Sequence, residues 1–576
     1  MTLLLGPVLR HVDETSALVW VQTDRRCTVE VLGCATDTFE VAGLHYAVVV
    51  VTGLEPDTRT PYEVHLDGER AWPRPGSPFP PSVIATRGPS TERHQKILFG
   101  SCRYVKLADP REARRYGLDA LDAYATRMTS RPPEEWPSVL LLLGDQVYAD
   151  ELTPQTRRRI ARRADRHPDW PDDEVVGFEE YSGLYRDSWS DPEVRWMMST
   201  VPTAMIFDDH DIRDDWNTSG VWREQIARLP WWRDRVRAGL VAYWVYQHLG
   251  NLTPAELAAD TDWQAVRSQD GDAWPLLAER ADRWDAETGA GADRHKDERF
   301  TFCWELGRTR LIVIDSRNGR IVESAPRKMV SDAEFDWITE RALAPGEIDH
   351  LVLGTPIPWL LPQVISDLQA GVERAGHRPG RIGRAAEFLR QEADLEHWPA
   401  FGHSFARMAE LVRAVGRPRD GRAAPATVSI VSGDVHHSYA ATADVHSGPD
   451  GDVAGGDAAG GVGDTARVHQ LTCSPVHNTV PGFMRVLFRL SWSRALARFS
   501  RLWLRGTRAA GRAGVSWERT AGPLFGNLIA TLQLDDRRAA VRFERPRTAS
   551  TLDTTAEVVL TAQAPTPRAP VTANPH

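Results

Sequence analysis

The sequence TAMIFDDHDIRDDWN, residues 203–217, joins a short apolar run to a dense cluster of acids. Residues 204–207 have the composition of a buried strand. The residues that follow within eight positions are Asp208, Asp209, His210, Asp211, Asp214 and Asp215. Carboxylates that leave water together repel one another, and each costs several kcal/mol unless a positive charge neutralises it. We therefore expect a metal ion at the end of this strand.

The acid cluster belongs to one of six similar strand ends. Apolar runs alternate with helical stretches such as 111–128, 221–249 and 332–344, which is typical of an α/β domain with a buried sheet. Each run ends in polar residues, and open α/β sheets gather their active sites at the carboxyl ends of their strands. The six runs are ILFGSC, SVLLLLGDQVY, TAMIFDDHD, RLIVIDSR, HLVLGTP and VSIVSGDVHH.

Residues 1–90 have a different pattern and are predicted to form an all-β sandwich. Short alternating or β-branched runs, such as SALVWVQT and HYAVVVVTGL, are separated by Gly, Pro and Asp turns. The stretch VVTGLEPDTRTPYEVHLDG resembles the fibronectin type III pattern, in which a leucine and a proline precede the strand that carries Tyr62. Five prolines in residues 73–81 predict a stiff linker. We expect a second domain at 91–561 and a disordered tail at 562–576.

The composition of the 576-residue chain excludes several classes of protein. Hydrophobic content of 42% and charged content of 26% indicate a globular protein with a large core. The net charge of −10 argues against a nucleic-acid binder, and no sequence-specific nucleic-acid binding is expected. Five widely spaced cysteines favour a reducing compartment. Because no signal peptide or membrane-spanning segment is seen, a cytoplasmic location is predicted.

Several strand ends carry side chains that commonly bind metals. They are GDQVYAD (144–150), FDDHD (207–211) and SGDVHH (432–437), to which GSC adds Cys102. Carboxylates suit Ca²⁺, Mg²⁺ or Mn²⁺, whereas thiolate, imidazole and phenolate suit iron or zinc. The mixture predicts a site with two or more metals, of the kind that catalyses phosphoryl transfer.

The order GSC, GDxxY, DDH and GDxH resembles the PhoD-like alkaline phosphatases, a branch of the calcineurin-like metallophosphoesterases, over roughly residues 96–545. The resemblance implies an α/β metallophosphatase domain behind a β-sandwich. It also implies Fe³⁺ and Ca²⁺ as cofactors, with Mn²⁺ or Zn²⁺ as alternatives. The residues that it assigns to the metals are Cys102, Asp145, Tyr148, Asp209, Asp434 and His436.

The resemblance also implies a role for each residue. Cys102, Tyr148 and Asp434 would hold the iron together with Asp145, which would bridge to a second metal. Asp209 and His436 would help to bind that second metal. His210 would meet the phosphate and, with Asp209, is expected to be catalytic. Asn217 is a candidate outer ligand or substrate contact.

Plainer interpretations of these residues stay open. Cys102 alone is typical of a buried small residue, and Tyr148 of a core aromatic. The acids Asp211, Asp214 and Asp215 could be solvated or paired with Arg213, while His403 and His437 have no metal role and are expected to be structural.

The predicted function is metal-dependent hydrolysis of phosphate mono- or diesters, in which a metal-bound hydroxide attacks phosphorus. One alternative is a catalytically idle, metal-containing protein that binds polyanions or anionic lipid. Another is a related metallohydrolase that acts on a different phosphorus or sulfur ester. The physiological substrate and the oligomeric state are left open.

Residues 481–515 hold eight arginines and no acid. The arginines that recur every three or four positions, as on one face of a helix, are Arg494, Arg498, Arg501, Arg505, Arg508 and Arg512. Three interpretations are open: a surface helix with a solvated basic face, a lid that attracts phosphate esters, and an interfacial helix in peripheral contact with anionic lipid.

Overall fold

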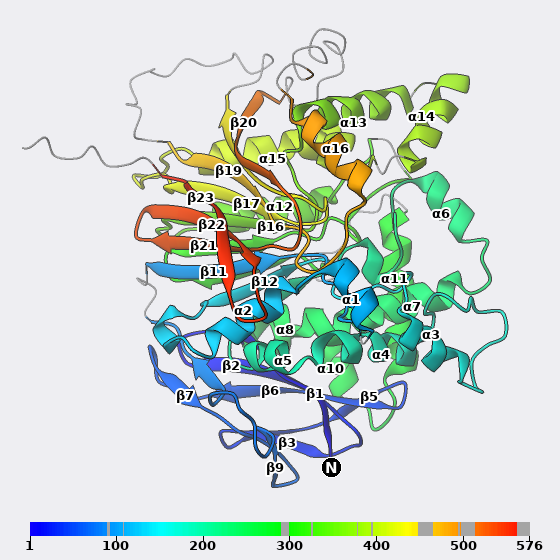
Figure 1. Cartoon of the computed structure of the whole chain (residues 1–576), viewed down its shortest axis with the longest axis vertical. Coiled ribbons are helices and arrows are strands. Elements are labelled where there is room, and N and C mark those ends of the chain that lie inside the picture. The colour runs from blue at the N-terminus through cyan, green and yellow to red at the C-terminus, as the bar shows by residue number, and fades with distance from the viewer. Residues whose placement is uncertain are drawn as a thin grey trace, which may run out of the picture.

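The structure is a computed structural model that describes residues 1–88, 93–107, 109–289, 299–323, 326–376, 378, 380–392, 395–446, 465–493, 496 and 513–561. A β-rich N-terminal region is followed by a mixed α/β region built on two sheets, which confirms the predicted fold class (Figure 1). Across these residues, no helix combines the length and the apolar character that a bilayer crossing requires.

The strands of the N-terminal region form three sheets. The first has the order β1 (Leu3–Val12), β2 (Ser16–Thr23), β6 (Leu44–Thr52) and β5 (Phe39–Val41). The second has the order β4 (Cys34–Asp37), β3 (Thr28–Val31), β8 (Val64–Leu66) and β9 (Glu69–Trp72). The third pairs β10 (Val83–Ala85) with β7 (Arg59–Pro61). The fibronectin type III resemblance and the boundary at residue 90 stay predictions.

Strand β2 is buried on both of its faces. Because successive side chains of a strand point to opposite faces, Val19 and Val21 enter the core between the N-terminal sheets, whereas Leu18 and Trp20 enter the core of the α/β region. The Trp20 ring lies 5.1 Å from the ring of Tyr246 in the α/β region. The N-terminal sandwich is therefore packed directly against the domain that follows it.

The proline-rich segment 73–81 also packs against the α/β region. Phe79 stacks on Trp196 with 5.6 Å between ring centroids, and the Trp196 indole N–H donates to the Pro80 carbonyl oxygen at 2.8 Å. The predicted stiff linker is thus anchored to the α/β region at its C-terminal end.

The α/β region contains a six-stranded and a seven-stranded sheet. The first has the order β13 (Thr203–Ile206), β12 (Val139–Leu143), β11 (His94–Gly100), β21 (Ile529–Asp535), β22 (Arg538–Pro546) and β23 (Leu552–Val559). The second has the order β14 (Phe302–Leu306), β15 (Thr309–Val313), β16 (His350–Thr355), β17 (Thr427–Ser432), β19 (Arg467–Thr472), β18 (Ser438–Val445) and β20 (Val515–Leu524). In each sheet the strands that lead to the predicted site run parallel.

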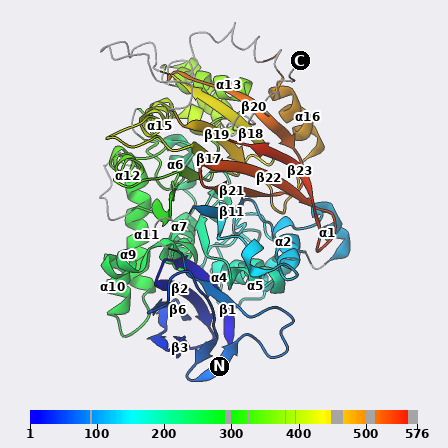
Figure 2. The same cartoon turned by 90° about the vertical axis from the view of Figure 1, so that its left-hand side faces the viewer.

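Helices cover the outer faces of the two sheets (Figures 1 and 2). On the seven-stranded sheet lie α12 (Asp332–Ala342), α13 (Gln363–Gly376) and α15 (Gly402–Val415), and on the six-stranded sheet lies α2 (Ala120–Met128). The remaining helices are α1 (Pro110–Tyr116), α3 (Pro154–Ala161), α4 (Phe178–Trp189), α5 (Pro192–Met198), α6 (Gly220–Ile226), α7 (Trp232–Tyr243), α8 (Leu249–Asn251), α9 (Pro254–Ala259), α10 (Thr261–Arg267), α11 (Trp274–Gly289), α14 (Arg381–Glu392) and α16 (Gly482–Ser491). Apolar side chains of both sheets meet in one core, so the carboxyl ends of the two sets of parallel strands come together.

Candidate metal centre

The predicted metal ligands lie on loops that leave four parallel strands. Cys102 follows β11, Asp145 and Tyr148 follow β12, Asp209 follows β13, and Asp434 and His436 follow β17. Two sets of side chains have ligand atoms within 4.8 Å of one another: Asp145, Asp209 and His210 form one, and Asp208, Asp209 and Asp434 the other. Asp209 belongs to both sets, so the geometry offers two adjoining positions for cations.

The loops that carry these residues have an unusual backbone. The non-glycine residues of these loops with positive φ are Cys102 (56°), Asp145 (45°), Asp215 (63°), Asn217 (62°), Asp434 (64°) and His436 (49°). Such conformations cost on the order of 1–3 kcal/mol each and cluster where function requires them. Left-handed turns after the strands direct the side chains back across the sheet edge, toward one another.

Two glycines let the strand ends approach closely. A Cβ on Gly144 would lie 2.6 Å from the Cβ of Asp208, and a Cβ on Gly433 would lie 2.0 Å from the Ser101 hydroxyl oxygen. Gly144 also has a φ of 109°, which other residues avoid. The glycine in each GD motif therefore allows the β11, β12, β13 and β17 loops to pack against one another.

The carboxylates of the centre are buried and lack the partners that buried carboxylates require. Asp145 Oδ1 and Asp208 Oδ2 accept no hydrogen bond from the described residues. Burial raises the pKa of Asp145 and of Asp208 well above the ordinary value, and the Asp209 carboxylate adds to both shifts. His210 opposes the shift of Asp145, and Arg317 opposes that of Asp208. Because these groups cannot all be ionised without further positive charge, the site fits hard cations.

Cys102 and Tyr148 lie in polar surroundings that a plain core residue would not need. The Cys102 sulfur lies 3.2 Å from each of the Ser101 and Ser474 hydroxyl oxygens. The Tyr148 hydroxyl donates to Asp145 Oδ2 at 3.3 Å and accepts from the Asn478 amide at 2.9 Å. Burial raises the pKa of both acidic groups, so each would ionise only beside a cation. The donor set fits the thiolate and phenolate ligands that iron accepts.

His210 is oriented by a buried carboxylate. Its Nδ1 lies 3.0 Å from Asp150 Oδ1, and its Nε2 lies 3.7 Å from the exposed Asp214 carboxylate. Burial alone would lower the pKa of His210, but the Asp150 charge outweighs burial and holds it well above its usual range. The same pair lowers the pKa of Asp150 to about 2 against the effect of burial. The Asp150 carboxylate therefore orients the His210 ring and favours its protonated form.

Four residues of the centre were not predicted from the sequence. Arg317 is fully buried and forms ion pairs with Asp208, with Asp209 at 3.3 Å and with Glu396 at 2.6 Å. Arg320 adds a second contact to Glu396 at 2.9 Å. The fourth is His397, whose Nε2 lies 3.1 Å from Asp434 Oδ2. The run RLIVIDSR that ends in Arg317 is one of the six predicted strand ends. Glu396 and His397 do not follow a strand-like run in the sequence, so no comparable signal indicated them.

A family model described as PhoD-like phosphatase matches residues 116–479, which is more than half of the chain. The chain belongs to the PhoD-like phosphatase family. Membership confirms the predicted resemblance and assigns the protein to the hydrolases of phosphate esters.

A comparison with solved structures agrees with this assignment. A solved structure titled "Structure of PhoD" aligns with a TM-score of 0.55 and 11% sequence identity, covering 97% of this chain and 89% of that chain. At this identity the likeness concerns the fold alone. A domain of unknown function (DUF7800) matches residues 1–84. The comparison with curated proteins found no match.

In this PhoD-like phosphatase, the remaining acids after β13 differ in their environment. Asp211 is buried, and its carboxylate accepts the main-chain N–H groups of Asp208 and Val147 at 3.0 and 3.2 Å. Burial raises its pKa to about 7. Asp211 is thus a structural residue of the loop and not a solvated acid, while Asp214 has a side chain that is 68% exposed.

Asn217 is buried between two arginines. Its Oδ1 accepts from Arg223 at 2.7 Å, and its amide N–H donates to the Arg317 carbonyl oxygen at 3.4 Å. These contacts anchor the loop next to Asp209, and a role for Asn217 toward substrate or metal stays a prediction. His437 is buried and His403 pairs with Asp332 at the surface, as expected for structural residues.

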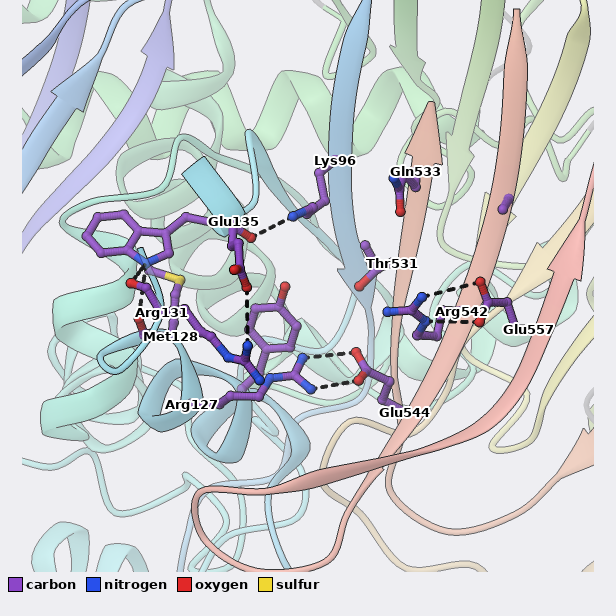
Figure 3. A pocket seen from close by; sticks show the side chains of 13 residues that line it. Lys96, Arg127, Met128, Arg131, Glu135, Thr531, Gln533, Arg542, Glu544 and Glu557 are labelled. Carbon is purple, nitrogen blue, oxygen red and sulfur yellow. Dashed lines mark hydrogen bonds and ion pairs between the residues drawn. The ribbon is translucent and has the colours of Figure 1, made fainter. Parts of the chain in front are cut away.

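A cavity of about 230 Å³ lies beside the opposite end of β11 and is lined by none of the predicted site residues (Figure 3). Three ion pairs lie across or along it, Arg127–Glu544, Arg131–Glu135 and Arg542–Glu557, and a fourth lining cation, Lys96, donates to the Glu135 carbonyl oxygen at 2.6 Å. Because the cavity contains none of the clustered carboxylates that could hold metal ions, the site is assigned to the metal centre.

Proposed function

We propose that this PhoD-like phosphatase hydrolyses phosphate mono- or diesters at the centre formed by the β11, β12, β13 and β17 loops. The observation that carries the proposal is the pair of adjoining ligand sets that share Asp209, with buried oxygens of Asp145 and Asp208 that receive no hydrogen bond from the described part of the chain. Cations in such sites supply a reactive water at neutral pH and charge that balances the phosphoryl oxygens.

The proposed ligands divide by chemistry. Cys102, Tyr148 and Asp434 would hold iron together with Asp145, which would also contribute to the second site, where Asp209 and His436 would hold the harder ion, with calcium as the proposed identity. Of these residues, the two sets of close ligand atoms contain Asp145, Asp209 and Asp434. Burial lowers the pKa of His436 to about 4, which keeps its imidazole neutral and free to bind a metal. His397 would fix the orientation of Asp434.

His210 is proposed to meet the substrate through Nε2. Since Nδ1 is held by Asp150, the proton on Nε2 points away from that contact and can be donated to a phosphoryl or leaving-group oxygen. The buried Arg317 offsets part of the negative charge of Asp208 and Asp209.

The test is hydrolysis of p-nitrophenyl phosphate and bis(p-nitrophenyl) phosphate by the purified full-length protein, with metal content measured on the same sample. Turnover of either ester that stops on chelation and returns on adding back the metals found supports the proposal. Metal-replete protein that hydrolyses neither ester would favour the idle binding protein.

The His210→Ala variant is expected to keep its metals and to lose roughly 10²-fold or more in kcat, the scale typical of general acid–base or electrostatic assistance. Asp150→Asn, which leaves the imidazole in place but removes its charge partner, should lose less. Steady-state kinetics and metal analysis of both variants check this. A His210→Ala protein without bound metal would instead make His210 a ligand.

Iron held by a phenolate and a thiolate should colour the protein, because such ligands transfer charge to ferric iron in the visible range, which zinc with its filled d shell cannot accept. We expect an absorption band that bleaches on reduction and that shifts or disappears in Tyr148→Phe and Cys102→Ser. A calcium-selective chelator should remove activity while leaving much of the colour. A colourless and fully active zinc or manganese enzyme would contradict the iron assignment.

A further inference from the structure

Helix α16 exposes an apolar surface to solvent. The exposed fractions of its large apolar side chains are 72% for Phe483, 55% for Val486, 53% for Leu487 and 52% for Leu490. At about 100° per residue, these four side chains fall within roughly one third of the helix circumference. Contiguous apolar surface of this kind marks a site of interaction in proteins, since isolated exposed residues do not align on one face.

Arginines border this apolar face. Arg485 and Arg489 are exposed on the neighbouring side of α16, whereas Phe488 turns inward and stacks on His437 with 4.4 Å between ring centroids. Trp492, just after the helix, donates from its indole N–H to His437 Nε2 at 3.4 Å. The helix is thus fixed to the loop that carries His436, and its outer surface is half apolar and half cationic.

A second apolar patch lies near α16. Helix α14 exposes Ile382, Phe388 and Leu389, and Phe388 is 66% exposed. Helix α13 contacts both α14 and α16, and the three helices lie together at the end of the molecule opposite the N-terminal sandwich (Figure 1). The apolar groups of this end are therefore not confined to a single helix.

The charge of this region selects the kind of partner. The chain carries a net charge of −10, yet residues 481–515 contain eight arginines and no acid. A negatively charged surface would be repelled by the protein as a whole but attracted here. A second copy of the chain fits less well, because a symmetric contact through α16 would bring Arg485 and Arg489 close to their own copies.

We propose that α16 docks this protein on an anionic lipid surface, with Phe483, Val486, Leu487 and Leu490 entering the interface and Arg485 and Arg489 contacting headgroup phosphates. Helices with an apolar face and a basic border bind membranes in this way, lying in the plane of the interface. Docking through α16 is independent of the proposed reaction, because none of these side chains is assigned to the metal centre. It would place the β17 loop, through Phe488 and His437, on the membrane side of the molecule.

The proposal is tested by flotation of the full-length protein with two kinds of vesicle. One contains phosphatidylcholine alone, and the other contains phosphatidylcholine with about one third phosphatidylglycerol. We expect binding to the anionic vesicles and little to the neutral ones. The double variant Phe483→Ser/Leu487→Ser should bind anionic vesicles about tenfold more weakly, or weaker still. The double variant Arg485→Gln/Arg489→Gln should lose about fivefold in vesicle affinity per arginine, and its binding should depend less on salt.

Leu118→Ser/Val559→Ser, which removes two exposed apolar side chains elsewhere, is the matched control and should bind as the unaltered protein does. Unchanged hydrolysis of a soluble aryl phosphate, or an unchanged melting temperature if no ester is hydrolysed, shows that each variant is folded. Equal binding to neutral and anionic vesicles, or none to either, would overturn the proposal. Self-association that only the α16 apolar variant abolishes, without vesicle binding, would assign the surface to a second copy.

Discussion

Asp145→Asn is expected to lower kcat/KM for phosphoester hydrolysis by roughly 10³-fold or more, which is close to complete loss. It should also lower the metal content while leaving the fold intact. Asp145 Oδ1 is buried with no hydrogen-bond donor among the residues that the structure describes, and its carboxylate lies in the ligand set formed with Asp209 and His210. An amide has the same shape but removes the charge that would hold a cation. Asparagine also tolerates the left-handed backbone that Asp145 adopts, with φ at 45°.

The matched control is Asp420→Asn, because Asp420 also has a positive φ, of 51°, but lies in an exposed turn away from the centre. In the absence of metal, neither variant should melt at a lower temperature than the unaltered protein. Burial and neighbouring carboxylates disfavour ionisation of Asp145, so any change in the melting temperature of Asp145→Asn should be an increase. Full activity with normal metal content in Asp145→Asn would refute the assignment of this carboxylate to the cations.

Arg317→Met is expected to destabilise the fold by about 3–5 kcal/mol, the scale for removing one partner of a buried ion pair. Its guanidinium is fully buried and contacts the carboxylates of Asp208, Asp209 and Glu396. Methionine fills similar space but leaves these carboxylates without their common counter-charge. Chemical denaturation measures the loss, with the same metal content in both proteins.

Arg233→Met provides the comparison for this stability measurement. Arg233 also pairs with a carboxylate, that of Asp282 at 2.7 Å, but its side chain is 69% exposed. An exposed pair contributes little to stability because solvent screens it, so the effect of its loss should be small. If Arg317→Met cost no more than Arg233→Met, the carboxylates around Arg317 would have to be protonated, and the electrostatic account of the centre would be wrong.

Local patterns in the sequence predicted the parts of the structure that local patterns determine. The runs before GSC, GDQVY, DDHD and GDVHH form parallel strands, because each is apolar on both faces and the sheets are covered on both sides. The glycines and aspartates that follow mark the loops of the centre, and the predicted family is confirmed.

Contacts between distant segments were not predictable in the same way. The strand order within the two sheets, which inserts β21–β23 beside β11, follows from packing and not from any local signal. Arg317 and Glu396 are 79 residues apart, and each looks like an ordinary charged residue until folding buries both. Asp211 was expected to be solvated or paired with Arg213, because sequence alone does not show that two main-chain N–H groups would face it.

The arginines at 494, 498, 501, 505, 508 and 512 lie outside the described residues, so the lid and surface-helix interpretations of that stretch stay predictions. The described part of the segment 481–515 contributes a different signal, the exposed apolar face of α16. That face was visible in the sequence as PGFMRVLFRLS, but the arginine spacing further along was the more conspicuous pattern.

The double burial of β2 has a consequence for how this chain melts. Trp20 and Leu18 belong to the core of the catalytic half, whereas Val19 and Val21 on the same strand belong to the sandwich. Neither half can unfold without exposing one buried face of a strand that both share. Heat should therefore unfold both halves in a single cooperative transition. A fragment cut near residue 90 would display the aromatic rings around Tyr246 to water and would be prone to aggregate. The gap between the two family matches, at residues 85–115, is therefore not expected to separate two units that unfold independently.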